Sequence, residues 1–204
     1  MKTTINLKMM VEKEACDEAA TTFRKAHGQK TVLLSEALES NGLQEAFWWI
    51  RNNELTPEQE KDIRLLACTY AEHTLHIFEG RNPDDKRPRK AIETARLYAN
   101  GDVSEEELRT ARGAAYVAAG DAGDAAGDAA TRAGDAAGDA AAYAGAAAYA
   151  AAAYAGAAAY AAAGAAAGAD TATRAATATR ADTAERHYQT EELKKVFLKW
   201  EQVR

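Results

Sequence analysis

Cysteine, proline and long hydrophobic runs are all scarce in this chain of 204 residues. Its three prolines and few β-branched runs argue against an extensive sheet. No apolar run approaches the ~20 residues that span a bilayer, and residues 1–14 lack the apolar centre of a signal peptide. The two cysteines, Cys16 and Cys68, lie far apart in helix-like surroundings. They predict two reduced, buried thiols and a cytoplasmic protein.

Neither half of the chain carries an excess of positive charge. The net charge is −6, and residues 1–112 and 113–204 each contribute −3. Binding to nucleic-acid phosphates or to anionic lipid needs a basic surface, so we expect neither a nucleic-acid partner nor a membrane partner. The chain also lacks a phosphate-binding loop, a dinucleotide fingerprint, a Ser-His-Asp order and a paired-cysteine motif. We therefore expect a protein that is not an enzyme and holds no cofactor.

One group of metal-binding residue types does occur. His73, His76 and Glu79 follow one another at intervals of three residues on a single predicted helix. A closed metal site needs further ligands with the right geometry, and no other Cys or His cluster is placed to supply them. We therefore interpret this group as a solvated or core-edge helix face, and we expect no metal.

Large apolar side chains are missing from a long stretch of the chain. Between Val117 and Leu193 there is no Leu, Ile, Val, Met or Phe, and a glycine recurs every eleven residues from Gly123 to Gly156. Eleven residues make three helical turns, so each repeated position stays on one face. Alanine is the best helix former, and small residues on one face let two helices approach closely. We therefore predict an all-α bundle with long, closely packed Ala/Gly-rich hendecad helices, in a homodimer or in an intramolecular hairpin.

Start and stop signals divide the rest of the chain into helices. Residues 56–59, Thr-Pro-Glu-Gln, and residues 104–107, Ser-Glu-Glu-Glu, are patterns that cap helix starts. Residues 3–7 are typical either of a short strand or of a helix lead-in. The expected helices are 11–26, 32–40, 43–52, 57–79, 88–100, one from 105 onward and 193–203, with breaks near residues 120–121, 164–170 and 190.

These elements predict three parts of the chain. An N-terminal helical domain covers residues 1–112, and a helical repeat rich in Ala, Gly and Tyr covers residues 113–189. A C-terminal helix over residues 190–204 carries an apolar face at Leu193, Phe197 and neighbouring positions. We expect this helix to dock on the N-terminal domain.

The densest polar group surrounds the start of the helix that Pro88 opens. Backbone N–H groups and the helix dipole favour an anion at such a start, and arginine adds bidentate recognition of phosphate or carboxylate. One interpretation is therefore an anion site. The other is that the cations pair with Asp84, Asp85 and Glu93 and clamp the loop. The cations are Arg81, Arg87, Arg89 and Lys90.

Tyrosines are the large side chains of the Ala-rich stretch. One interpretation is that they fill gaps between alanine-lined helices as its core. The other is that they line a cleft for a planar, anionic ligand such as a nucleotide, together with arginines. The candidate residues are Tyr143, Tyr149, Tyr154, Tyr160, Arg174 and Arg180.

Part of the chain resembles a known family. The residues that carry the resemblance are Phe78-Glu79, the run Pro83-Asp84-Asp85-Lys86-Arg87-Pro88-Arg89-Lys90-Ala91-Ile92-Glu93, Ala95-Arg96, Gly101, Ser104 and Glu107. About residues 66–120 resemble the immunity-protein family found beside polymorphic toxins in bacteria. Related Ala-rich proteins of bacteriophages also resemble the start of the chain, at residues 15–18 and 23–24. The Gly- and Tyr-rich hendecads depart from the family pattern.

The resemblance implies a small, non-enzymatic, helical binding protein of biological conflict. Three functions stay open. A phage-type counter-defence protein would sequester a small anionic, nucleotide-derived immune signal and so block host defence. An immunity or inhibitor protein would bind a toxin or a host defence enzyme by protein–protein contact. A structural protein would assemble with itself through its Ala-rich helices.

Overall fold

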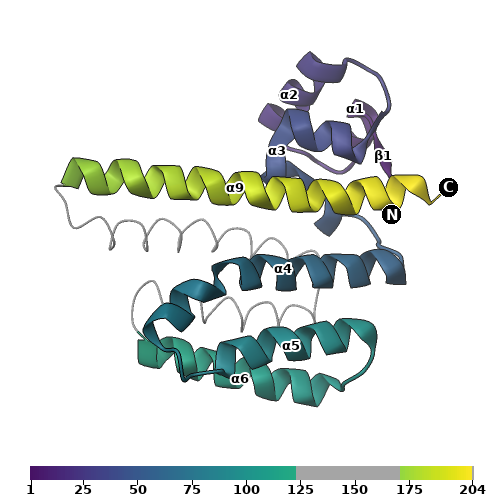
Figure 1. The fold of residues 1–204 in the computed structure, drawn as a ribbon. Helices are drawn as coiled ribbons and strands as arrows, with labels where there is room; N and C mark the ends of the chain where they lie inside the picture. Colours follow the sequence, from purple (N-terminus) through teal and green to yellow (C-terminus); the bar gives the residue numbers. More distant parts are fainter. Residues whose placement is uncertain (123–170, 204) are drawn as a thin grey trace. The chain divides into compact units, whose positions relative to one another are not determined.

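The computed structural model describes residues 1–122 and 171–203 (Figure 1). These residues form seven helices and one two-stranded sheet, so the predicted all-α class is confirmed for the part of the chain described. The hendecad repeat, residues 123–160, lies outside the described residues. The chain divides into two compact units, which we call unit 1 (Met1–Gln59 with Gln189–Arg204) and unit 2 (Glu60–Tyr188).

Unit 1 contains the sheet and the first three helices of the chain. The two strands pair antiparallel, with Thr4 opposite Leu33 and Ile5 opposite Val32. Residues 3–7 thus supply both of the predicted alternatives, a short strand and then a helix start. In chain order the elements are β1 (Thr4–Ile5), α1 (Leu7–Glu12), α2 (Asp17–His27), β2 (Val32–Leu33), α3 (Leu34–Arg51) and the end of α9 (Thr171–Gln202).

The prediction of one helix over residues 11–26 is wrong. The chain leaves α1 after Glu12, and Glu14 adopts a positive φ of 61°, a left-handed conformation that interrupts a helix. The Cys16 sulfur then accepts a hydrogen bond from the Ala19 backbone N–H at 3.4 Å and caps α2. Cys16 is exposed and Cys68 is buried, so the prediction of two buried thiols holds only for Cys68.

The two helices predicted over residues 32–40 and 43–52 are joined in α3. Residues 32 and 33 belong to β2, so α3 begins at Leu34, where the Leu33 N–H donates to the Glu36 carboxylate at 2.8 Å. Gly42 has φ 83° and ψ 178° and kinks the helix. The glycine that predicted a stop therefore produces a bend.

The core of unit 1 brings α2, α3 and the end of α9 together. Phe23 and Phe47 are almost fully buried, and so are Leu193 and Phe197 of α9. Polar contacts add to this packing, because Ser35 donates its backbone N–H and its hydroxyl to the Glu201 carboxylate at 3.0 and 2.9 Å. These contacts hold the end of α9 beside the first turn of α3.

The predicted break near Thr190 is wrong, because α9 runs without interruption from Thr171 to Gln202. Buried side chains recur at Gln189, Leu193 and Phe197, at the spacing of one helix face. The Thr-Glu-Glu sequence at 190–192 resembles a capped start, but it lies inside this helix. Continuous burial along one face outweighs the local capping pattern.

The described part of unit 2 is built from α4 (Pro57–Arg81), which begins in unit 1, α5 (Arg87–Asn100), α6 (Glu105–Ala122) and the first part of α9. Both predicted caps are confirmed. The Gln59 N–H donates to the Thr56 hydroxyl at 3.2 Å and the Thr56 N–H donates to the Gln59 side chain at 3.1 Å. Ser104 and Glu107 exchange the same pair of bonds at 3.3 and 2.8 Å.

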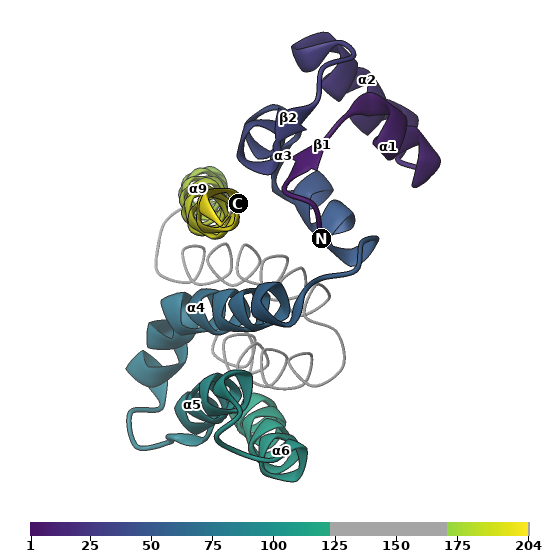
Figure 2. The same cartoon turned by 90° about the vertical axis from the view of Figure 1, so that its right-hand side faces the viewer.

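A single apolar cluster holds α4, α5 and α6 together. Figures 1 and 2 show α5 and α6 side by side, and their contact faces are lined mainly with alanine. Small side chains let two helices approach closely, whereas larger side chains fill the space between helices by interdigitation. The buried members are Cys68, Ala71, Leu75, Phe78, Ala91, Ile92, Ala95, Leu108, Ala115 and Ala118.

None of the helices in residues 1–122 and 171–203 combines the length and the apolar character needed to cross a membrane.

Candidate functional site

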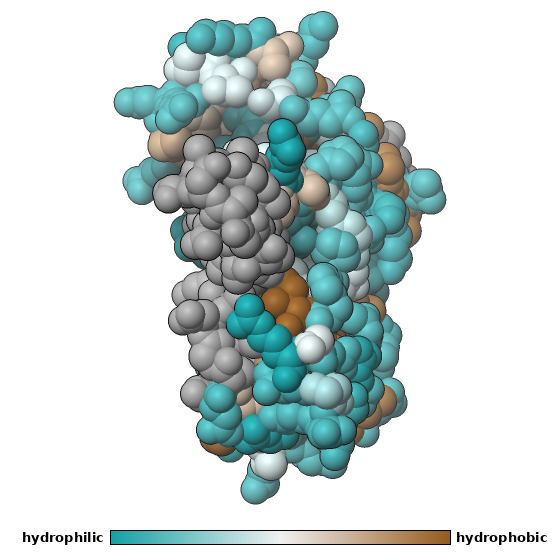
Figure 3. Space-filling view, turned by 60° about the vertical axis from the view of Figure 1, so that its left-hand side comes forward, coloured by the Kyte–Doolittle hydropathy of each residue, from teal (hydrophilic) through white to brown (hydrophobic). Residues whose placement is uncertain are grey.

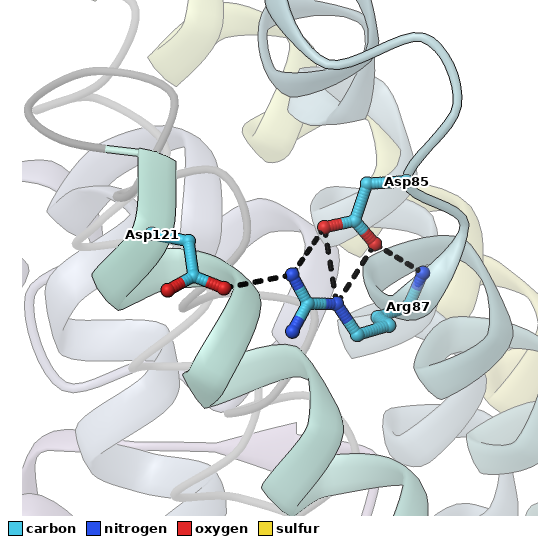
Figure 4. Close-up of polar contacts among 3 residues, drawn as sticks. All are labelled: Asp85, Arg87 and Asp121. Atoms are coloured by element: carbon cyan, nitrogen blue, oxygen red, sulfur yellow. Dashed lines mark hydrogen bonds and ion pairs between the residues drawn. The ribbon is translucent and has the colours of Figure 1, made fainter.

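The start of α5 is occupied by a carboxylate of the chain itself. Asp85 accepts hydrogen bonds from the Arg87 backbone N–H at 3.0 Å and from the Arg87 guanidinium at 3.0 and 2.6 Å (Figure 4). The guanidinium also donates to Asp121 of α6 at 3.0 Å. The bond from Arg87 holds the pKa of Asp85 below its usual range. Asp85 therefore takes the position that an external anion would fill.

Arg89 is held against α4. Its guanidinium makes a two-point contact with the Glu79 carboxylate at 2.6 and 2.7 Å and lies 3.8 Å from Glu72. Glu72 also accepts a hydrogen bond from Arg96. These bonds hold the pKa values of Glu72 and Glu79 below their usual range, because arginine stabilises the ionised carboxylate. The four side chains clamp α4 to α5.

The remaining predicted cations are not brought together by the structure. Arg81 and Lys90 are exposed on α4 and α5, and Arg180 is exposed on α9. The side chain of Arg174 and four other residues of the predicted cleft lie outside the described part of the structure. Those four are Tyr143, Tyr149, Tyr154 and Tyr160.

An open groove of about 770 Å³ runs between α5 and α6. No sequence motif indicated this groove, although its α5 residues, 87, 90, 94 and 97, have the spacing of one helix face. Leu97 contributes an exposed apolar side chain, with 44% of its surface accessible. The α6 side and the loop before it contribute Val103, Glu106, Glu107, Thr110, Ala111 and Ala114.

A second hollow, of about 700 Å³, lies in unit 1 where α1 and α3 end. Three exposed cations line it, Lys2, Lys13 and Arg51. None of the three forms an ion pair with a described residue. Two of them lie at helix C-termini, where a cation complements the helix dipole. The other lining residues are Met9, Glu12, Trp49, Asn52, Asn53 and Glu54.

The predicted core-edge group at the end of α4 has separate partners. The His73 ring lies 2.7 Å from the buried carboxylate of Glu185 and stacks on the Tyr188 ring at 3.7 Å. His76 contacts the backbone oxygen of His73 at 2.9 Å, and Glu79 is bound to Arg89 as described above. Among the described residues, no group of three or more His, Cys, Asp or Glu side chains is arranged to hold a metal ion.

Cys68 is the buried thiol of unit 2. Burial raises its pKa to about 12, so the thiol is protonated at neutral pH. Since the thiolate is the nucleophilic form, this side chain is a packing group and not a reactive one.

Comparison with known proteins agrees with the resemblance drawn from the sequence. A family model described as Imm-5 like putative immunity protein matches residues 53–196. The match extends well beyond residues 66–120 on both sides and includes all of unit 2. Neither a curated protein nor a solved structure matches the chain. The family match covers more than half of the chain, which therefore belongs to the Imm-5 like putative immunity protein family.

Proposed function

We propose that this protein is an immunity protein that binds a toxin protein and inhibits it by contact, without catalysis. The observation that carries the proposal is the family match over residues 53–196, which contains unit 2 entirely. Unit 2 is thus the part of the chain in which we expect the shared function of the family to reside.

The chemistry of unit 2 supports binding over catalysis. Arg87 and Arg89, the two arginines nearest the start of α5, are engaged with carboxylates of neighbouring segments. Charge-assisted, two-point contacts of this kind fix geometry. A scaffold held in this way presents a preorganised surface, and preorganisation lowers the entropic cost of binding a partner.

The proposal is tested by co-expression. The toxin encoded beside the gene for this chain is expressed in a susceptible bacterium, with and without the chain. We expect the chain to restore growth and to purify with the toxin in a complex of fixed stoichiometry. Loss of growth in the presence of folded, abundant chain would overturn the proposal.

We propose as a second candidate the sequestration of a small anionic ligand, such as a nucleotide-derived immune signal, by a phage-type protein. The observation that favours it is the hollow of unit 1, whose cations Lys2, Lys13 and Arg51 have no ion-pair partner among the described residues. Its volume of about 700 Å³ suits a small molecule. This site differs from the one predicted around Arg87.

Calorimetry with a panel of linear and cyclic nucleotides tests this second candidate on the full chain. Binding that is lost in the double variant Lys13→Glu, Arg51→Glu supports it, and the absence of heat with every nucleotide contradicts it. Native mass spectrometry of the same samples reports whether the free chain is a monomer. It thereby tests the further proposal of a homodimer or a self-assembling protein.

A further inference from the structure

The groove between α5 and α6 faces away from the apolar cluster of unit 2. The buried face of α5 carries Ala91, Ile92 and Ala95, whereas the groove is lined by Lys90, Thr94 and other residues of the neighbouring face. On α6 too, the buried residues and the groove-lining residues lie on different faces, and Ala111 lies between the two faces. Each helix therefore has one face in the core and a second face turned to the groove.

The groove is apolar toward the end of α5. Leu97 is 44% exposed there, Val103 lies in the loop that follows, and Ala111 and Ala114 line the α6 wall. A single exposed leucine is common on protein surfaces. Here the leucine lies in a hollow that Val103, Ala111 and Ala114 also line. A partner side chain placed in this hollow would bury Leu97 together with its neighbours and gain hydrophobic free energy.

The two ends of the groove carry opposite charges. The contact between Arg87 and Asp121 joins the start of α5 to the end of α6, so the two helices run antiparallel. Lys90 therefore lies near one end of the groove and Glu106 near the other. Neither side chain forms an ion pair within residues 1–122 and 171–203. A partner with the reverse order of charges would satisfy both.

We propose that this groove is the surface on which the toxin docks, and that the docking element is a helix of the toxin. This inference rests on the proposed function. A groove between two helices accepts a third helix through ridges and grooves. The toxin helix carries an apolar side chain against Leu97, an acidic residue toward Lys90 and a basic residue toward Glu106. From Lys90 to Leu97 is about 10 Å at ~1.5 Å per residue, so roughly two helical turns separate the acidic residue of the toxin helix from its apolar residue.

The apolar contact is tested with a matched pair of substitutions. Leu97→Glu places a charge in the groove, and Leu198→Glu makes the same change on α9, where the leucine is 42% exposed. We expect Leu97→Glu to weaken toxin binding about tenfold or more and Leu198→Glu to leave the Kd unchanged. Calorimetry gives the Kd, and circular dichroism confirms that each variant is folded.

The charge contact is tested at exposed positions, where a substitution does not disturb the core. Lys90→Glu in the groove is compared with Lys61→Glu on α4, which is also exposed and also lacks a described ion pair. We expect only Lys90→Glu to weaken binding and to reduce the dependence of the Kd on salt. Exchange of the facing acidic residue of the toxin for lysine should restore the affinity of Lys90→Glu.

The outcomes distinguish failure of the docking site from failure of the proposed function. If the wild-type chain binds the toxin and both groove variants bind it equally well, the docking site is wrong and the proposed function stands. If the wild-type chain does not bind the toxin, both fail. If Leu97→Glu instead abolishes self-association of the free chain and leaves toxin binding intact, the groove holds a second copy and the docking proposal is overturned.

Discussion

Asp85 binds the same groups at the start of α5 that would bind an external anion. The sequence places free N–H groups and four cations around the start of α5, which is the pattern of an anion site. The structure shows that Asp85, two residues before Arg87, lies close enough to satisfy both the backbone and the guanidinium. Asp84, its neighbour in sequence, forms no ion pair among the described residues. The sequence identifies the cations, but it does not show whether Asp84 or Asp85 pairs with them.

Ion pairs of unit 2 make its stability depend on pH. The pKa values of Glu72, Glu79 and Asp85 are lowered by bonds to arginine. A carboxyl group whose pKa is lower in the folded state stabilises the protein at any pH above its unfolded-state pKa. This contribution is lost as the pH falls through its folded-state pKa. The ordinary values are 4.5 for Glu79 and 3.8 for Asp85. We therefore expect full stabilisation at neutral pH and a loss that begins below about pH 4.5.

Replacement of Glu79 tests this contribution. Glu79→Gln should lower the free energy of unfolding at pH 7 by about 1 kcal/mol, because Arg89 loses its two-point partner. The difference from wild type should shrink at pH 3, where the wild-type carboxylate is itself being protonated. Urea denaturation at both pH values measures it. Asp84→Asn is the control, and a loss of the same size in that variant would contradict the role given to Glu79.

At the scale of the elements, local signals identified most helix starts and failed where tertiary contacts decide. The reciprocal caps at residues 56–59 and 104–107 are short-range patterns and form as predicted. The turn at Glu14 has no glycine to signal it, and the strands at residues 4–5 and 32–33 exist through their pairing with each other. Burial of one face carries α9 through Thr190, where the sequence alone favours a new start.

Two glycines of unit 2 can be compared directly, because one ends α5 and the other lies inside α6. Gly101 has φ 83° and Gly113 lies inside α6, and a Cβ added to either would meet no atom within 4 Å. Gly101→Ala should therefore destabilise unit 2 by about 1 kcal/mol through backbone strain alone. Gly113→Ala should stabilise it by about 0.5–1 kcal/mol through helix propensity. Thermal unfolding measures both, and shifts of the same sign would contradict the end assigned to α5.

Continuity of α9 is tested with proline at residue 191. If Thr190 were a cap, Glu191 would be the first helical residue, where proline is well tolerated. Inside a continuous helix, Glu191→Pro removes a hydrogen bond and clashes with the preceding turn, so we expect a loss of about 3 kcal/mol. Chemical denaturation compares it with Glu191→Ala. Equal stability of the two variants would contradict the uninterrupted helix.

At the scale of the whole molecule, the family match and the division into units point to the same region. Residues 53–196 match the family and contain unit 2, whereas most of unit 1 lies outside the match. Composition and the run around Arg87 predicted the all-α class and the family. The groove between α5 and α6 was beyond prediction, because its walls come from helices whose facing surfaces only the fold defines. The Ala-rich repeat lies outside the described residues, so the ligand site lined by its tyrosines stays a prediction.

The central claim is that the chain inhibits a toxin by forming a complex with it. The most direct measurement is the activity of a fixed amount of purified toxin, titrated with the purified full chain. We predict that activity falls linearly and reaches its minimum at a fixed molar ratio, because each inhibited toxin retains its inhibitor. Unchanged activity in excess chain would contradict the account, and so would complete inhibition by a small fraction of an equivalent, which requires a catalytic inhibitor.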